Sequence, residues 1–230
     1  MQRNLILSPK EGYNLIAPFY DSWKWQEFWR YNEYPFIERW CDRLEVGYGA
    51  DLGAGSGNNL DCFLKRYHHV TAYDISEMMS MICRQKYEQQ IACGLLECIE
   101  KDIRELSVNQ RQYDWLLCNR VLSHIYDIDN VIRRMAHILK KGGECFISDV
   151  HPLHHYEHTH YRIGDRNIII STYKHGIEDL RSCFYMNGLS IIEFKEIAKP
   201  DLIAPALAER FHSIKDDTTP IFYYMVLRKL

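Results

Sequence analysis

Three glycines at alternate positions follow an acidic residue in residues 51–58, which read DLGAGSGN. A glycine turn lets the backbone pass close to a ligand that any β-carbon would exclude. The residues after this turn are expected to form a helix. The free N–H groups and positive dipole end of that helix would point toward the same ligand. The segment therefore predicts a loop that binds a nucleotide-type cofactor.

The acidic residue and the glycine spacing narrow the choice of cofactor. The dinucleotide fingerprint is G-x-G-x-x-G, whereas this chain has Gly53-x-Gly55-x-Gly57 with Asp51 two positions upstream. A carboxylate beside the turn would repel a pyrophosphate and attract a cofactor that carries an ammonium group. The pattern favours an amino-acid-like adenosine cofactor over NAD.

Alternating strand and helix patterns must position these residues from residue 46 onward. Strands are predicted at 46–52, 69–73, 95–99, 114–118 and 144–150, and helices at 57–66, 76–90 and 128–140. This alternation is typical of βαβ units in a parallel sheet, where ligands lie beyond the carboxyl ends of the strands. Further along, the sequence predicts a loop, a strand, a helix and two closing strands separated by a long excursion, at 151–163, 168–173, 176–187, 189–197 and 221–227.

The motifs in this order resemble the class I S-adenosylmethionine-dependent methyltransferases, over roughly residues 46–150 plus the closing strands. Asp74 follows the second strand, where the family binds both ribose hydroxyls. Asp102 follows the third strand, where the family places an acidic residue near the adenine amino group. Asn119 follows the fourth, beside the methionine end. The resemblance implies S-adenosyl-L-methionine as cofactor and these binding residues: Asp51, Gly53, Ala54, Gly55, Gly57, Asp74, Ile75, Met79, Asp102, Ile103 and Asn119.

The resemblance also implies the fold class, α/β with a Rossmann-like, seven-stranded, mostly parallel sheet and helices on both faces. Residues 1–230 are expected to form one methyltransferase domain. It would comprise a helical aromatic cap at 1–45, a cofactor-binding core at 46–150, and a substrate-side insertion with the closing strands at 151–230. The cap holds four of the five tryptophans. These aromatics would either pack on the core or form a lid over a small-molecule site.

Three residues are candidates for catalysis: His124 after the fourth strand, His151 after the fifth, and Tyr20 in the cap. A base is needed only when the acceptor atom must lose a proton, and histidine suits that task near neutral pH. Tyr20 resembles a cap tyrosine that closes over the cofactor in relatives. For His151, a role in ordering its loop is an equally good interpretation.

Five histidines gather between 151 and 160, and among them His154 and His158 have the spacing i, i+4. A metal site is not predicted there, because no cysteine pattern accompanies the histidines and Pro152 favours an irregular backbone.

Composition excludes several function classes. A net charge of −3 without a basic stripe disfavours nucleic acid as a partner. No segment approaches the roughly 18 apolar residues that a membrane span requires, and the apolar patch near the N-terminus is too short for a signal peptide. Eight scattered cysteines without a C-x-x-C pair favour free thiols in a reducing compartment, which predicts a cytoplasmic protein.

The leading hypothesis is a methyltransferase that moves a methyl group from S-adenosylmethionine to an O or N atom of a compact small-molecule acceptor, for which aromatic character is expected. An alternative is a non-catalytic S-adenosylmethionine-binding protein on the same fold, acting as a regulatory or partner subunit. A nicotinamide-dependent oxidoreductase is less favoured by the glycine spacing. The acceptor and the oligomeric state are left open by the sequence.

Overall fold

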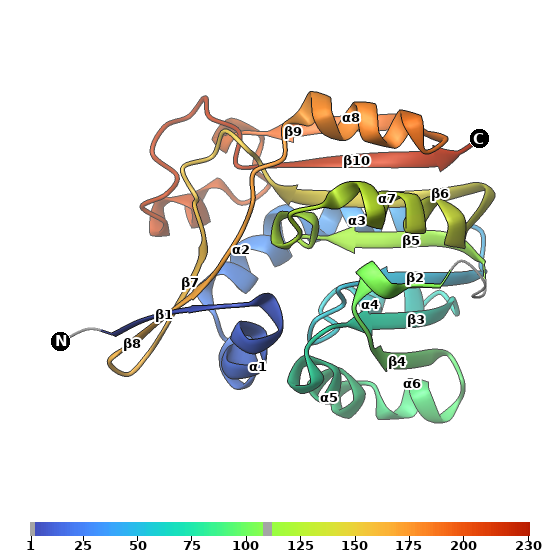
Figure 1. Cartoon of the computed structure of the whole chain (residues 1–230), viewed down its shortest axis with the longest axis horizontal. Coiled ribbons are helices and arrows are strands. Elements are labelled where there is room, and N and C mark those ends of the chain that lie inside the picture. The colour runs from blue at the N-terminus through green and yellow to red at the C-terminus, as the bar shows by residue number, and fades with distance from the viewer. Residues whose placement is uncertain (1–2, 108–111) are drawn as a thin grey trace.

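The computed structural model describes residues 3–107 and 112–230. Its main sheet has seven strands in the order β4-β3-β2-β5-β6-β10-β9 (Figure 1). Neighbouring strands pair in parallel from β4 to β6, and β10 pairs antiparallel with both β6 and β9. The strands are β2 (Tyr48–Leu52), β3 (His69–Asp74), β4 (Leu96–Glu100), β5 (Tyr113–Asn119), β6 (Leu139–Val150), β9 (Leu189–Ile197) and β10 (Phe222–Lys229). The predicted α/β fold with a seven-stranded, mostly parallel, Rossmann-like sheet is confirmed.

Apolar side chains cover both faces of this sheet. In β5, Trp115 and Leu117 pack into one cluster, while Leu116 and Cys118 pack into the other. Successive side chains of a strand point to opposite faces, so residues 115–118 in the middle of this strand are apolar on both faces. The helices that provide the covering layers are α2 (Lys24–Asn32), α3 (Tyr34–Cys41), α4 (Leu60–Leu64), α5 (Glu77–Lys86), α6 (Glu88–Ala92), α7 (Ile128–Ile138) and α8 (Ile177–Met186).

A second sheet of three strands lies beside α1 (Pro9–Tyr20), on the left of Figure 1. Its order is β1 (Arg3–Leu7), β8 (Arg166–Ile170) and β7 (Thr159–Ile163), with β1 parallel to β8 and β7 antiparallel to it. Gly12 lets α1 lie directly on this sheet, since a β-carbon there would be 2.4 Å from Cγ1 of Ile170. The cap and the insertion, which are far apart in sequence, thus form one structural unit.

Several predicted boundaries were wrong, each for a local reason. The loop predicted at 151–163 contains β7, and the apolar patch near the N-terminus is β1. The helix predicted at 57–66 is only α4, because the loop continues through Gly57 in a left-handed conformation, with φ 82°. The helix predicted at 76–90 divides at Tyr87, whose hydroxyl donates to the Gly57 carbonyl over 2.9 Å.

The helix predicted at 128–140 ends at Ile138, and β6 begins at once. Pairing between β5 and β6 then jumps from Leu139 to Glu144, around Gly142 at φ 77°. The strand predicted at 168–173 is β8, and the excursion between β9 and β10 contains only short 3₁₀ turns at Lys199–Asp201 and Pro205–Arg210.

All eight cysteines are free thiols, five of them buried. Among the residues that the structure describes, none of the helices is long and apolar enough to cross a membrane. Within the same residues, histidine, cysteine and acidic side chains nowhere gather in a group of three that could hold a metal ion. Met1 and Gln2, at the start of the predicted cap, lie outside the described residues.

Candidate active site

A cavity of about 630 Å³ lies between the carboxyl ends of the parallel strands and the cap. Its floor is the glycine turn and the ends of β3, β4, β5 and β6. Aromatic side chains of the cap form its roof: Tyr13, Tyr20, Trp23, Trp25 and Trp29. Small-molecule sites occupy volumes of about 300–1,000 Å³ and combine apolar walls with a few polar groups. The cavity therefore has the size, position and lining of a ligand site, and aromatic side chains of the cap cover it.

The three glycines of the turn have different functions. All have positive φ, at 84°, 57° and 82° for Gly53, Gly55 and Gly57. A β-carbon on Gly53 would lie 2.3 Å from Cγ2 of Val121, and one on Gly57 would lie 2.8 Å from Sγ of Cys83. On Gly55 its nearest neighbour would be 3.9 Å away, so that position opens into the cavity. Two glycines therefore allow tight packing, and Gly55 keeps the floor of the cavity clear.

Asp74 ends β3 and holds the turn in place. Its Oδ2 accepts the Gly55 N–H and its Oδ1 accepts the Ser76 N–H, each over 2.7 Å. Burial raises the pKa of Asp74 to about 6, and these two N–H groups oppose the shift. Each carboxylate oxygen keeps a free lone pair toward the cavity. Asp74 can thus accept two more hydrogen bonds from a ligand, as a ribose diol would supply them.

Asp51 is buried under the turn and does not line the cavity, and one of its oxygens, Oδ2, has no hydrogen-bond partner. Burial and the neighbouring Asp74 raise its pKa to about 8, while Arg120 opposes the shift. Asp51 was predicted to act on a cofactor directly or through water, and its place beneath the turn favours the indirect route.

The ends of β3 and β4 provide the opposite wall. Ile75, Met79 and Ile103 line the cavity with apolar surface. Asp102 also lines it, but its carboxylate is held by Arg104, with Nε 2.9 Å from Oδ2. Although burial alone would raise the pKa of Asp102, the hydrogen bonds from Arg104 hold that pKa below its usual value.

The residue after β5 is a partly buried cation, Arg120, which the sequence reasoning did not select as a site residue. Arg120 has a left-handed backbone, with φ 56°, and its Nε lies 3.2 Å from Oε2 of Glu33. Its guanidinium also donates to Oδ1 of Asn119 and stacks over Trp29. Burial disfavours this charge, yet Glu33 and the neighbouring tyrosines raise the pKa of Arg120. A positive φ on a residue as bulky as arginine is strained, and such strain is common at functional sites.

His124 lies on the short turn after β5, with its ring facing the cavity. Its Nδ1 is 3.1 Å from the carbonyl oxygen of Ser171, which can only accept, so Nδ1 carries the proton. Its Nε2 is then an acceptor, and it accepts a hydrogen bond from the Tyr13 hydroxyl over 2.9 Å. Burial lowers the pKa of His124 to about 4, so the ring is neutral at physiological pH.

Comparison with known proteins agrees with this geometry. A family model described as a methyltransferase domain matches residues 50–147, the segment that holds the glycine turn and the ends of the central strands. The match supports a class I S-adenosylmethionine-dependent methyltransferase domain in this segment.

Curated relatives match this domain in part. The ubiquinone biosynthesis O-methyltransferase of Coxiella burnetii is 29% identical over 100 residues, which are 44% of this chain and 42% of that protein. The arsenite methyltransferase of Mus musculus is 29% identical over 124 residues, 48% of this chain and 32% of that protein. The chain thus spans less than half the length of these curated relatives.

Solved structures share the fold over most of the chain. An S-adenosylmethionine-dependent methyltransferase from Mesorhizobium loti has a TM-score of 0.67 and 20% identity, covering 86% of this chain and 97% of that one. The magnesium protoporphyrin IX methyltransferase from Synechocystis has a TM-score of 0.61 and 16% identity, covering 95% and 97%. At these identities the likeness establishes the fold.

The methyltransferase domain brings most of the predicted site residues to one cavity, which is lined by Tyr20, Gly53, Ala54, Gly55, Asp74, Ile75, Met79, Asp102, Ile103, Asn119 and His124. Asp51, Gly57 and His151 do not line it. His151 is buried, with Nδ1 accepting the Leu153 N–H and Nε2 donating to Glu196 over 2.8 Å. Both ring nitrogens are therefore engaged away from the cavity. The structure supports the loop-ordering interpretation of His151 and not the catalytic one.

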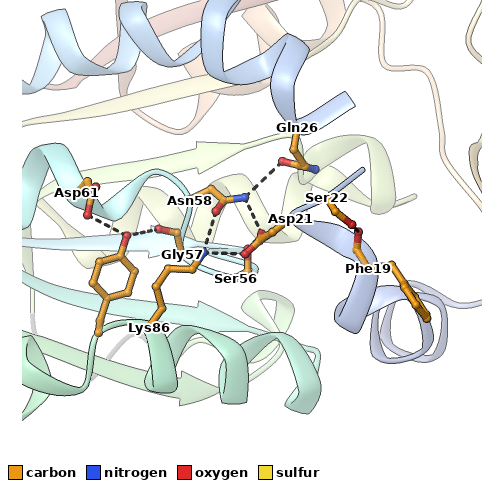
Figure 2. A network of polar contacts seen from close by, with 10 residues as sticks. Phe19, Asp21, Ser22, Gln26, Ser56, Gly57, Asn58, Asp61 and Lys86 are labelled. Atoms are coloured by element: carbon orange, nitrogen blue, oxygen red, sulfur yellow. Dashed lines mark hydrogen bonds and ion pairs between the residues drawn. The ribbon is translucent and has the colours of Figure 1, made fainter. Parts of the chain in front are cut away.

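The cap of the methyltransferase domain is fastened to the glycine turn by Asp21, at the end of α1 (Figure 2). Its carboxylate accepts the Ser56 hydroxyl at 2.5 Å and the Asn58 amide at 3.0 Å, and it pairs with Lys86 at 2.9 Å. These contacts join α1, the turn and α5. They place the neighbouring Tyr20 above Gly55, which explains why this tyrosine lines the cavity. We call Asp21, Ser56, Asn58 and Lys86 the cap latch.

Proposed function

We propose that this protein transfers a methyl group from S-adenosyl-L-methionine to an O or N atom of a small-molecule acceptor. One observation carries the proposal. The Asp74 carboxylate, fixed by two backbone N–H groups, faces the space that Gly55 keeps open, in a cavity closed by aromatic side chains. A ribose diol donates two hydrogen bonds, and such a carboxylate accepts both.

Residues of this cavity would hold the cofactor in three parts. Ile75, Met79 and Ile103 would contact the adenine, Asp74 the ribose, and the Gly53–Gly55 backbone with Asn119 the methionine end. The bound cofactor supplies a methyl group on a positively charged sulfur. The protein's own contribution is then to align the acceptor for in-line attack and to exclude water, which lowers the barrier by several kcal/mol.

The acceptor would lie between the cap and the ends of β5 and β6. This side of the cavity is lined by Trp23, Trp29 and Tyr156, together with polar groups of Arg120 and His124. Flat apolar walls with few polar groups favour a compact, aromatic acceptor over a polymer. Two relatives are named as methyltransferases of small-molecule chemistry, one as an O-methyltransferase of ubiquinone biosynthesis and one as an arsenite methyltransferase. A cytoplasmic location fits the eight free thiols.

Calorimetry and thermal shift with three ligands would test the proposal. S-adenosylmethionine and S-adenosylhomocysteine should both bind and stabilise the protein, and NAD should do neither. Methyl-labelled cofactor, incubated with a metabolite library, should then give a labelled product. Binding without any labelled product would favour the non-catalytic regulatory alternative, and stabilisation by NAD alone would refute the proposal.

A further inference from the structure

Tyr13 is a cavity residue to which neither a sequence motif nor the family match assigns a role. It lies on α1, 111 residues before its hydrogen-bond partner His124, and its hydroxyl and the His124 ring both face the cavity. The two rings meet edge to face, with centroids 5.3 Å apart. A residue of the cap thus completes a polar pair with a residue of the core.

The proton positions in this pair are fixed by the backbone. Because the Ser171 carbonyl accepts a hydrogen bond from Nδ1 of His124, the Nε2 atom carries no proton and must accept. The Tyr13 hydroxyl must therefore donate to Nε2. The Tyr13 oxygen has used its single proton and keeps two lone pairs, one of which can accept from the Thr159 hydroxyl. The other lone pair can accept a hydrogen bond from a hydroxyl group in the cavity. The result is a directed chain from the cavity through Tyr13 to His124, anchored at Ser171.

We propose that Tyr13 and His124 form a proton relay that removes the proton of a hydroxyl acceptor during its methylation, so that the substrate is an alcohol or phenol. The inference rests on the proposed function. In the step, a lone pair of the acceptor oxygen forms the new O–CH₃ bond while the C–S bond breaks and its electron pair stays on sulfur. The acceptor proton passes to Tyr13, and the Tyr13 proton passes to His124 Nε2. The positive charge of the sulfonium ends on the imidazolium.

The chemistry of the two acceptor types separates them. A hydroxyl oxygen has a lone pair while it still holds its proton, and that proton becomes strongly acidic as the O–C bond forms. A weak base is then sufficient. An alkylammonium has no lone pair until it is deprotonated, and burial makes the His124 imidazole a weak base for that task. The relay therefore suits hydroxyl acceptors and is poorly matched to aliphatic amines.

The surroundings keep the relay neutral before reaction. The charged and titratable side chains that act on the pair are Arg120, which lowers the pKa of both members, and Tyr20 and Tyr156, which raise that of Tyr13. Burial has the largest effect on each, lowering the pKa of His124 and raising that of Tyr13. Neither ring is charged between pH 5 and 9, so the relay changes state only when a substrate proton arrives.

Four variants test the relay: Tyr13→Phe, His124→Gln, the double variant, and Tyr185→Phe as a control on an exposed helix face. The acceptor panel is phenol, catechol and benzyl alcohol against benzylamine and cyclohexylamine. Wild type should methylate hydroxyl acceptors only. Each single change should lower kcat by about 10²–10⁴-fold with little change in KM, and the double variant should lose no more than the worse single one. Tyr185→Phe should match wild type.

Nitrogen NMR of His124 gives a readout that does not depend on turnover. Wild type should show protonated Nδ1 and bare Nε2, with the Nε2 signal shifting in Tyr13→Phe. Methylation of the amines alone, no methylation of the three hydroxyl acceptors, full kcat in both single variants, or a proton on Nε2 would each overturn the relay. Failure of S-adenosylhomocysteine to bind would instead refute the proposed function. The NMR measurement would then still show whether the protons of His124 lie where the relay requires.

Discussion

Replacing Asp74 by alanine separates cofactor binding from folding. The carboxylate accepts the N–H groups of Gly55 and Ser76 and would accept two ribose hydroxyls. A hydrogen bond to a charged group contributes about 1.5–3 kcal/mol. Loss of two such bonds therefore weakens the binding of S-adenosylhomocysteine by about 3–6 kcal/mol, or roughly 10²–10⁴-fold in Kd.

The same change should leave the fold nearly as stable as before, because two effects oppose each other. Two backbone N–H groups lose their acceptor, which costs about 1–3 kcal/mol for each group that stays dry. Against this, the wild-type carboxylate has a pKa of about 6 instead of 3.8. Its ionisation at pH 7 costs at most about 3 kcal/mol, and less once water in the cavity screens the charge. Two such losses less this gain leave a net cost of at most a few kcal/mol, a shift of several degrees in Tm.

The pH dependence of stability checks the electrostatic part of this reasoning. Between pH 3.8 and about 6, folded wild type binds more protons at Asp74 than the unfolded chain does. Its stability should therefore fall as the pH rises through that window and stay lower above it. Asp74→Asn lacks this group and should show a smaller fall.

Calorimetric titration with S-adenosylhomocysteine and chemical unfolding at several pH values would measure both effects of the Asp74 change. Asp102→Asn is the matched control. Its carboxylate is already held by Arg104, so its loss should weaken binding by less than about tenfold. An Asp74→Ala variant that keeps wild-type affinity, or that fails to fold, would refute the reasoning.

Three further changes probe the turn, the latch and the buried histidine. Gly55→Ala should keep the fold and weaken cofactor binding about tenfold or more in calorimetry, because the new methyl group enters the cavity at φ 57°; unaltered affinity would place the ligand elsewhere. Asp21→Asn should raise the Kd of S-adenosylhomocysteine about three- to tenfold by loosening the cap latch, while Lys65→Gln, which breaks an exposed pair on α4, should not. His151→Gln should lower the unfolding free energy by about 1–2 kcal/mol with kcat within threefold of wild type, and a large loss of kcat at full stability would restore its catalytic assignment.

The sequence predicted the main sheet well because its strands are marked by two strong local signals. Each central strand contains a short apolar run, and β2, β3 and β4 end at or next to glycine or an acidic residue where the chain turns into the cavity. The second sheet lacked such signals. The strand β7 begins in a polar, histidine-rich stretch, and its apolar residues Tyr161 and Ile163 are only half-buried. The strand β8, which pairs with β7, also pairs with β1, a partner more than 150 residues away that no local pattern reveals.

The sequence predicted those site residues whose type and position belong to a local motif. Asp74 and Gly55 belong to that class. Tyr13, Glu33 and Arg120 do not, because their importance comes from contacts across the cavity. One signal was available for Arg120, since it directly follows the last residue of a buried strand, at the edge where ligands bind. His151 directly follows β6 at the same edge of the sheet, yet its ring is hydrogen-bonded to Glu196 on β9, the last strand in the sheet order.

The charge around the turn argues independently for a cationic ligand. Asp51, Asp74 and Asp149 all have raised pKa values, at about 8, 6 and 6, with burial as the first cause. Arg120, the cation at this end of the cavity, is paired with Glu33. A pyrophosphate placed on Gly55 would add two negative charges to carboxyls that already resist ionisation. A ligand with an ammonium and a sulfonium instead supplies positive charge, which lets these carboxyls ionise. Burial of the carboxyls therefore favours such a cationic ligand, whereas it disfavours a dinucleotide.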